Sequence, residues 1–178
     1  MQINIISFGN DPEFIKDLCS YYIKISNYYH INDIILKPPK SSSSKPSKSE
    51  IDHIKSQTSN LIFDKISQIE KKSSRNLYNN SGKFLNVILS QDGNQIDSYN
   101  FTKMIEDITI NSRNINFIIG SFFGLDVDLL KKKYNNNSNL VTSISISKMT
   151  FPSKIIKTLL LEQIYRSYTI INNISYHK

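Results

Sequence analysis

Apolar residues along the chain alternate between two patterns, short continuous runs and a spacing of three or four positions. Short apolar runs bounded by turn residues predict five strands, at 2–8, 33–37, 84–90, 115–119 and 141–147. Apolar residues three or four positions apart predict helices at 11–29, 50–72, 98–112 and 126–134, with a last helix that starts near Pro152. Regular alternation of strand and helix predicts an α/β fold, with a mainly parallel sheet of five or six strands and helices on both faces.

Local signals indicate where several helices begin. Asp11 followed by Pro12 is typical of an N-cap with proline at the first helical position, and Ser98 is a second candidate N-cap. Pro152 suits the first turn of the last helix. The apolar positions that recur at helical spacing after it are Ile155, Ile156, Leu159, Leu160, Ile164 and Tyr168. By contrast, residues 37–49 are polar and rich in serine and proline, which predicts a flexible surface insert.

Composition narrows the class of protein. A chain of 178 residues favours one domain spanning 1–178, and a net charge of +7 favours a polyanionic partner such as RNA. The single Cys19 excludes an internal disulfide, so we expect a reducing compartment and a packing role for this residue. No apolar run reaches membrane-spanning length and Met1 leads straight into a strand, so we expect a soluble, cytoplasmic protein. One Cys and three scattered His give no metal-ligand spacing, so no metal is expected.

Ligands of parallel α/β sheets bind beyond the carboxyl ends of the strands. The segments after the third, fourth and fifth strands are therefore the candidate site. The last helix also carries Glu162, Tyr165 and Arg166, and the chain closes on 176–178 (Tyr-His-Lys). A packed helix gives these terminal groups a rigid base from which to act.

These segments resemble one known family. The runs 147–152 (SKMTFP), 161–166 (LEQIYR) and 176–178 (YHK) look like the signature of the ribosomal RNA large-subunit methyltransferase H family. This family belongs to the SPOUT class of knotted methyltransferases. Weaker similarity extends to 1–9 (MQINIISFG), to a mid-chain turn at 89–93 (LSQDG) and to the glycine loop in 117–125 (FIIGSFFGL), and so covers nearly the whole chain.

The resemblance implies a fold and an activity that periodicity cannot reveal. It implies a C-terminal trefoil knot, formed with the substrate-binding segment by residues 147–178, whereas the pattern alone would give an unknotted sheet. It also implies a homodimer that uses S-adenosylmethionine to methylate the imide nitrogen of a pseudouridine in large-subunit ribosomal RNA, within assembled ribosomes. Cytosolic and organellar ribosomes both remain open.

The resemblance also assigns roles to residues. The implied cofactor-binding residues are Leu89, Gly120, Ser121, Gly124, Ser147, Lys148, Met149, Thr150, Phe151 and Pro152. The implied substrate-binding residues are Tyr165, Arg166, Tyr176, His177 and Lys178. Within that set, His177 is the candidate base or proton relay because its pKa lies near neutrality. Arg166 would contact phosphate or a base edge, and Tyr176 would stack on the base or hydrogen-bond to it.

Several alternatives stay open. Arg166 could instead pair with Glu162, one helical turn earlier, and Lys154 and Lys157 could be solvated lysines rather than site cations. The chain departs from the family where Ser121, Phe122 and Phe123 replace a second glycine and a small or polar pair, and where Ser153 replaces a histidine. We expect the two phenylalanines to pack at a dimer interface, with stacking on adenine or a nucleobase as the alternative.

Two other functions stay open, and the departures motivate the first of them. The first is a catalytically silent RNA- or ribosome-binding protein that keeps the fold. The second is a small-molecule enzyme on a flavodoxin-like sheet, which would account for the alternation of strands and helices but not for the tail.

Overall fold

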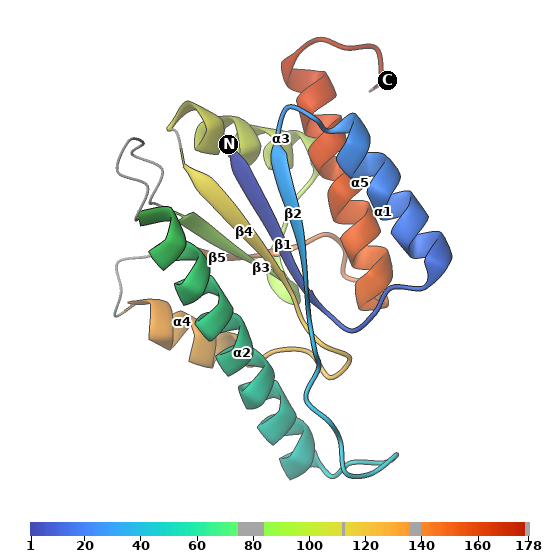
Figure 1. Cartoon of the computed structure of the whole chain (residues 1–178), viewed down its shortest axis with the longest axis vertical. Coiled ribbons are helices and arrows are strands. Elements are labelled where there is room, and N and C mark those ends of the chain that lie inside the picture. Colours follow the sequence, from blue (N-terminus) through green and yellow to red (C-terminus); the bar gives the residue numbers. More distant parts are fainter. Residues whose placement is uncertain (75–83, 112, 136–139, 177–178) are drawn as a thin grey trace.

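Five parallel strands form the centre of the protein. The computed structural model describes residues 1–74, 84–111, 113–135 and 140–176. In these ranges the sheet has the order β2-β1-β4-β3-β5 (Figure 1). Its strands are β1 (Gln2–Phe8), β2 (His30–Leu36), β3 (Phe84–Gln95), β4 (Asn114–Ile119) and β5 (Leu140–Ser145). The predicted α/β fold with a parallel sheet is thus confirmed, and the sheet has five strands in the described part of the chain.

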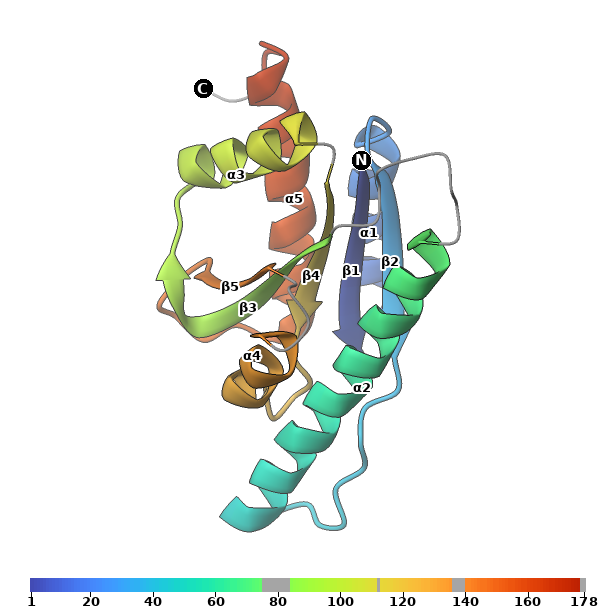
Figure 2. The ribbon, with the colours of Figure 1, turned by 90° about the vertical axis from the view of Figure 1, so that its left-hand side faces the viewer.

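Helices cover both faces of this sheet (Figures 1 and 2). One face packs against α1 (Glu13–Ile25), α3 (Ser98–Ile110) and α5 (Ser153–Ile171), and the other against α2 (Lys48–Ser74) and α4 (Val127–Asn135). The alternation in β1 explains how one strand serves both layers. Ile3 and Ile5 belong to the first core, and Ile6 and Phe8 to the second. Cys19 is buried in the first core, as predicted, and burial raises the pKa of its thiol.

A row of asparagines crosses the buried sheet. The amide of Asn32 donates to Asn4, Asn4 to Asn116, and Asn116 to Asn86, over distances of 2.7–2.9 Å. Each pair occupies matched positions on neighbouring strands. Because a one-residue slip would leave these buried amides without partners, the row fixes the register of four strands. It therefore helps to align their carboxyl ends, where the candidate site lies.

Some predicted boundaries were wrong. α1 ends at Ile25 rather than 29, and β2 begins at His30 rather than 33, because a turn between them brings the His30 N–H to the Met1 carbonyl. α2 begins at Lys48 and so takes up the end of the predicted 37–49 insert. β3 runs on to Gln95, because it bulges after Leu89 and then pairs again with β5 at Ile144 and Ser145. The expected turn at 89–93 is therefore part of an irregular strand.

Two predicted caps were also wrong. Asp97, not Ser98, caps α3, because its carboxylate accepts from the Asn100 N–H at 2.7 Å. Pro12 and Pro152 themselves occupy the N-cap positions of α1 and α5, without side-chain capping bonds. Asp11, the predicted cap of α1, pairs instead with two lysines of α5.

The course of α5 sets the layout of the molecule. It starts at the carboxyl edge of the sheet, packs against α1 and α3, and ends near the opposite edge, where the described chain also ends (Figure 1). The C-terminal trefoil knot that the family resemblance implies stays a prediction. Within the described ranges, no helix has both the length and the apolar character needed to cross a membrane.

Candidate functional site

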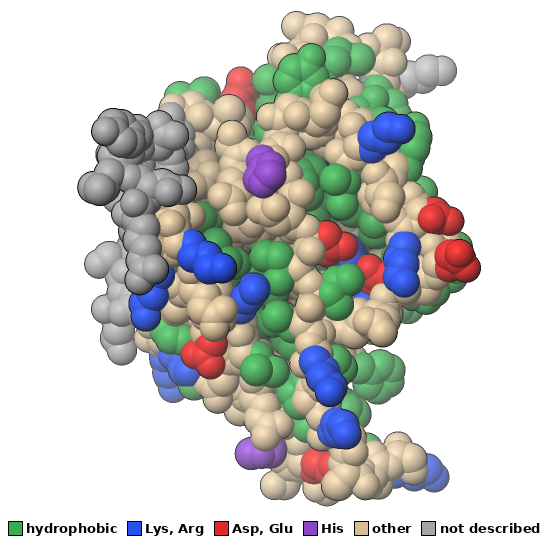
Figure 3. All heavy atoms as spheres, viewed as in Figure 1, with side chains coloured by type: hydrophobic (Ala, Val, Ile, Leu, Met, Phe, Trp, Pro, Cys, Tyr) green, Lys and Arg blue, Asp and Glu red, His purple; other side chains and the backbone are tan. Residues whose placement is uncertain are grey.

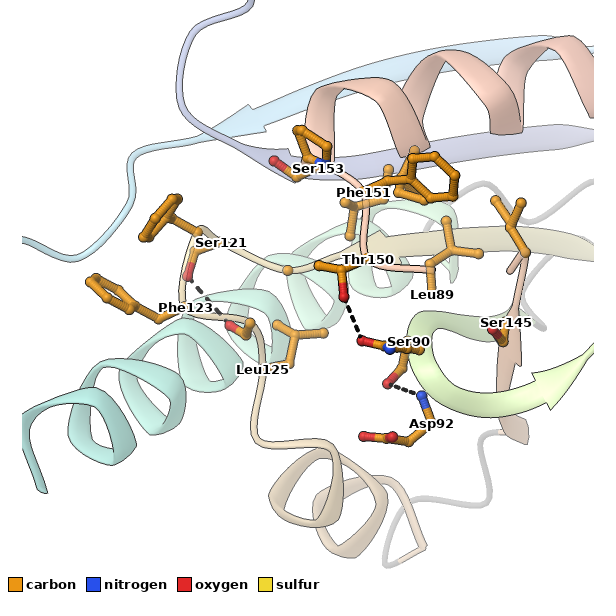
Figure 4. A pocket seen from close by; sticks show the side chains of 18 of the residues that line it. Leu89, Ser90, Asp92, Ser121, Phe123, Leu125, Ser145, Thr150, Phe151 and Ser153 are labelled. Carbon is orange, nitrogen blue, oxygen red and sulfur yellow. Dashed lines mark hydrogen bonds between the residues drawn. The ribbon is translucent and has the colours of Figure 1, made fainter. Parts of the chain in front are cut away.

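A cleft of about 910 Å³ opens at the carboxyl ends of β3, β4 and β5 (Figure 4). Three segments that lie far apart in the sequence line it, drawn from 89–92, 119–127 and 145–156, with Lys55 of α2 at its edge. Every residue that the sequence suggested for cofactor binding lines the cleft except Lys148, whose carbonyl accepts from the Gln91 side chain at 2.8 Å. The structure thus has a cleft where the order of strands and helices predicted a site, beyond the carboxyl ends of β3, β4 and β5.

The loop after β4 is a tight, fixed turn. The Gly124 N–H donates to the Ser121 carbonyl at 2.9 Å, and Gly124 has φ +88°, which side chains rarely tolerate. A Cβ on Gly120 would lie 3.0 Å from the Leu125 side chain and 3.1 Å from the Gly124 backbone. The Ser121 hydroxyl lies 3.2 Å from that of Thr58 in α2. Ser121, a departure from the family pattern, is thus bonded within the protein and ties the loop to α2.

The loop after β5 is held by a side chain that sequence reasoning missed. The Gln91 amide donates to the Lys148 carbonyl, and its oxygen accepts from the Thr150 hydroxyl at 3.1 Å. Ser147 adds a local bond, because its hydroxyl accepts from the Met149 N–H at 3.0 Å. Gln91 therefore joins two walls of the cleft. Its place in the 89–93 motif was the only signal of this role.

Buried charges anchor the start of α5. Lys157, with 0% of its surface exposed, contacts Asp11 at 2.5 Å and Asp33 at 2.6 Å, while Lys154 contacts Asp11 at 2.8 Å. Lys154 also donates to the carbonyls of Phe8 and Gly9. The view of Lys154 and Lys157 as solvated lysines was therefore wrong, because both turn inward to Asp11, which follows β1, and Lys157 also reaches Asp33 within β2.

The ion pairs that Lys154 and Lys157 form with Asp11 and Asp33, which we call the anchor, stay charged over a wide pH range. Burial works to lower the pKa of Lys157, but hydrogen bonds and charges from Asp11 and Asp33 outweigh it, so this pKa lies above its ordinary value. Burial works to raise the pKa of Asp11, yet its bonds to Lys154 and Lys157 hold that pKa below its ordinary value. The ion pairs thus fix the first turns of α5 against the sheet.

The predicted substrate residues form a second cluster, near the far end of α5. The Arg166 guanidinium contacts Glu162 at 2.6 Å, so the ion pair that spacing suggested is present. The Tyr176 ring lies over this guanidinium at 5.0 Å and against Tyr165 at 4.8 Å, and its hydroxyl donates to Glu162 at 3.3 Å. Burial, aided by bonds to neighbouring groups, raises the pKa of Tyr176 to about 12. This phenol therefore stays protonated near neutral pH and serves as a donor rather than a base.

The structure does not bring the two predicted sets together. Pro152 at the cleft and Arg166 are fourteen positions apart on one helix, which corresponds to about 21 Å. One chain cannot close this gap, because α5 is continuous between them. His177 and Lys178, the predicted base and phosphate contact, lie outside the described residues.

The cleft supplies binding surface but little acid–base chemistry. The charged side chains among its described lining residues are Lys55, Asp92 and Lys154, and Lys154 is already engaged with Asp11. No imidazole lines it in the described part of the chain. In the same part, no group of three His, Cys, Asp or Glu could hold a metal ion. The Asp92 carboxylate is therefore the one acidic group among the described lining residues.

Comparison with known proteins gives a consistent result. A family model described as "Predicted SPOUT methyltransferase" matches residues 1–177. Proteins named ribosomal RNA large subunit methyltransferase H from Finegoldia magna, Clostridium tetani and Malacoplasma penetrans are 34%, 33% and 32% identical, and each alignment covers 100% of both chains. Since the family model and these relatives span essentially the whole chain, this protein belongs to the SPOUT methyltransferase family.

Proposed function

We propose that this protein uses S-adenosylmethionine to methylate large-subunit ribosomal RNA, at the imide nitrogen of a pseudouridine, as a cytoplasmic homodimer. The observation that carries the proposal is the convergence of three separate segments, after β3, β4 and β5, on one cleft. The names of the full-length relatives support ribosomal RNA as the substrate.

The residues of the cleft suit an adenosyl cofactor. Its volume lies in the range of small-molecule sites, and Leu89, Leu125 and Ile146 provide apolar walls for a flat base. Gly120 and Gly124 let the backbone approach a ligand closely, and the Asp92 carboxylate could receive hydroxyl or ammonium groups. S-adenosylmethionine would supply an electrophilic methyl group there, and these residues would hold and orient it.

The substrate must lose a proton during the transfer. The imide nitrogen lies between two carbonyls, so it becomes a good nucleophile only as its proton leaves. We assign the role of acceptor or relay to His177, because its ordinary pKa is near neutral. Arg166, held in place by Glu162, would contact phosphate through its guanidinium, with Tyr165 and Tyr176 beside it and Lys178 adding charge.

This division of labour requires two copies. The Arg166 and Tyr176 cluster lies about 21 Å along α5 from its own cleft, so it would serve the cleft of a second copy. An apolar surface offers a route to such a pair. Phe14, Leu18 and Tyr21 lie exposed along α1 at helical spacing, and Ile155 is exposed on the neighbouring α5. We assign this α1–α5 surface to the contact between copies.

Two measurements test the proposal. Calorimetric titration with S-adenosylmethionine should show binding in roughly the micromolar range, about 8 kcal/mol. Incubation with radiolabelled cofactor and ribosomes that lack the modification should label large-subunit RNA, and mapping should find the methyl group on a pseudouridine. Failure to bind the cofactor would favour a catalytically silent RNA-binding protein instead.

A further inference from the structure

Phe122 is an exposed aromatic side chain at the mouth of the cleft. Phe122 is 91% exposed, more than any other large hydrophobic residue in the described part of the chain. The neighbouring Phe123 meets it edge to face, with ring centroids 5.1 Å apart. Both residues line the cleft, and Figure 4 shows Phe123 at its outer side, away from Leu89. An apolar ring in this position is ready to be covered by something that enters the cleft.

The turn that carries these rings is already fixed. Its ends are joined by the bond from Gly124 to the Ser121 carbonyl, and Ser121 is held to Thr58 of α2. Phe123 supports Phe122 from the side. A ligand that stacked on Phe122 would therefore need to order little of the protein, which favours binding.

Positive charge lies on the same cleft as the rings. Lys55 of α2 lines the same cleft. The projecting start of α2 and the segment before it carry Lys37, Lys40, Lys45 and Lys48 as well, against Glu50 and Asp52. Figure 3 shows lysine side chains on this projecting end. An exposed aromatic next to cations is the usual arrangement for unpaired nucleic acid, in which a base stacks and phosphates are neutralised.

We propose that Phe122, supported by Phe123, stacks on an unpaired nucleobase of the RNA as it enters the cleft, while Lys55 neutralises a neighbouring phosphate. The inference rests on the proposed function and adds to it that the enzyme takes its target from a single-stranded stretch. Stacking on an aromatic ring tolerates any base, so this contact holds the strand and leaves the choice of nucleotide to other groups.

A second copy of the chain is the competing occupant of this surface. The turn is tied to α2, whereas the exposed apolar side chains assigned above to the dimer are Phe14, Leu18 and Tyr21 of α1 and Ile155 of α5. In the shared site proposed above, a second copy brings its cationic Arg166 cluster to this cleft, so that cluster and Lys55 would both face the phosphates of the RNA rather than each other. Both points favour RNA.

The test uses a short single-stranded RNA that carries one fluorescent adenine analogue, because stacking quenches its emission. Binding to the wild-type protein should quench the signal. Phe122→Ala should abolish the quenching and weaken RNA binding roughly tenfold, whereas Phe122→Trp should retain both. A matched control is Tyr99→Ala, which removes an exposed ring with a lysine over it from α3, outside the cleft lining, and should change neither.

Two further readouts separate the possible failures. Dimer mass should be the same in Phe122→Ala and wild type, and a loss of affinity for S-adenosylmethionine with RNA binding unchanged would assign the ring to the cofactor and overturn the inference. Unchanged RNA binding and quenching in Phe122→Ala would overturn the inference, as would conversion of that variant to a monomer, which would assign the ring to the contact between copies. If the wild-type protein bound RNA through Phe122 but showed no affinity for the cofactor, the proposed function would fail while the stacking contact stood.

Discussion

The two ends of α5 are held by different physical means. At its start, Lys157 is fully buried between Asp11 and Asp33. Lys154 contacts the other carboxylate oxygen of Asp11 and donates to two backbone carbonyls. Near its other end, Arg166 and Glu162 form a partly exposed pair, covered by the ring of Tyr176, which is itself 38% exposed. Buried pairs resist rearrangement because removing one partner strands the other, whereas exposed pairs are individually weak.

This contrast matches the roles proposed for the two ends. A cleft that is to hold a cofactor between three loops needs its walls fixed before the ligand arrives, and the buried charges fix one of them. A cluster proposed to meet RNA and a second copy of the chain gains from remaining at the surface, where such partners would complete it. The continuous helix between the two ends holds them at a constant separation of about 21 Å.

The largest expected effect is on the buried end. Lys157→Met should lower the free energy of unfolding by about 3–5 kcal/mol, because Asp11 and Asp33 lose a buried counter-ion. Urea denaturation would measure the loss. Lys16→Met, at an exposed position on α1, is the control and should change stability by less than about 0.5 kcal/mol. Equal stability of the two variants would contradict the claim that the buried ion pairs of Lys157 stabilise the fold.

The ion pair between Lys157 and Asp11 also predicts how the free energy of unfolding depends on pH. The pKa of Asp11 is held below its ordinary value of 3.8, so its contribution is present above that pH and is lost as the pH falls through the folded-state pKa. The pKa of Lys157 is raised above 10.5, so its contribution is present below that pH and is lost as the pH rises further. The stability difference between wild type and Lys157→Met should therefore be constant near neutrality and should shrink in strong acid and strong base.

A second expected effect is at the exposed end, on turnover. Arg166→Ala should slow methyl transfer roughly 100-fold, about 2.7 kcal/mol, while affinity for S-adenosylmethionine stays unchanged because the cleft is distant. Radiolabelled transfer to ribosomes and calorimetry would measure the two quantities. The matched control is Arg113→Ala, just beyond α3, which should behave as wild type. Loss of cofactor affinity in Arg166→Ala would mean that the two ends are not separate.

A smaller effect is expected beside the cleft, at Gly93, which follows the lining residue Asp92. A Cβ there would lie 2.6 Å from the backbone carbonyl carbon of Ile144, so Gly93→Ala must push β3 away from β5. We expect a loss of about 1–3 kcal/mol in stability together with weaker cofactor binding, because both strands feed the cleft. Gly9→Ala is the comparison, because its Cβ would meet nothing within 4 Å and only φ +73° opposes it. It should cost about 1 kcal/mol and leave cofactor affinity intact. Similar cofactor affinities in both variants would argue against a structural role for the β3–β5 contact in the cleft.

The smallest effect is expected from Tyr176→Phe. This change removes the bond to Glu162 but keeps the ring over Arg166, so activity should fall only about threefold, some 0.6 kcal/mol. Since the pKa of Tyr176 is about 12, the pH profile of turnover below about pH 10 should be the same in both proteins. A basic limb that vanished in the variant would show that the phenol ionises during catalysis.

How much the sequence could predict differs between levels of structure. The order of strands and helices followed from apolar spacing, and the cleft from the rule that ligands bind beyond the carboxyl ends of parallel strands. The anchor could not be predicted, because Asp11 is 146 positions from Lys157 and a local pattern reads it as a cap. Gln91 escaped notice for the same reason, since its bonds depend on how β3 and β5 meet. The separation of Arg166 from the cleft, by contrast, was within reach of the sequence, because fourteen helical positions after Pro152 correspond to about 21 Å.

The most direct test of the central claim is complementation between subunits. One variant would carry Gly120→Leu to block the cleft, and the other Arg166→Ala to disable the substrate end, each being inactive on its own. If each site combines the cleft of one copy with the Arg166 cluster of the other, a mixed dimer contains one intact site. Co-expression should then restore roughly a quarter of wild-type methyl transfer, given random pairing in a two-fold symmetric dimer. Co-expressed dimers as inactive as either variant alone would contradict a site shared between two copies.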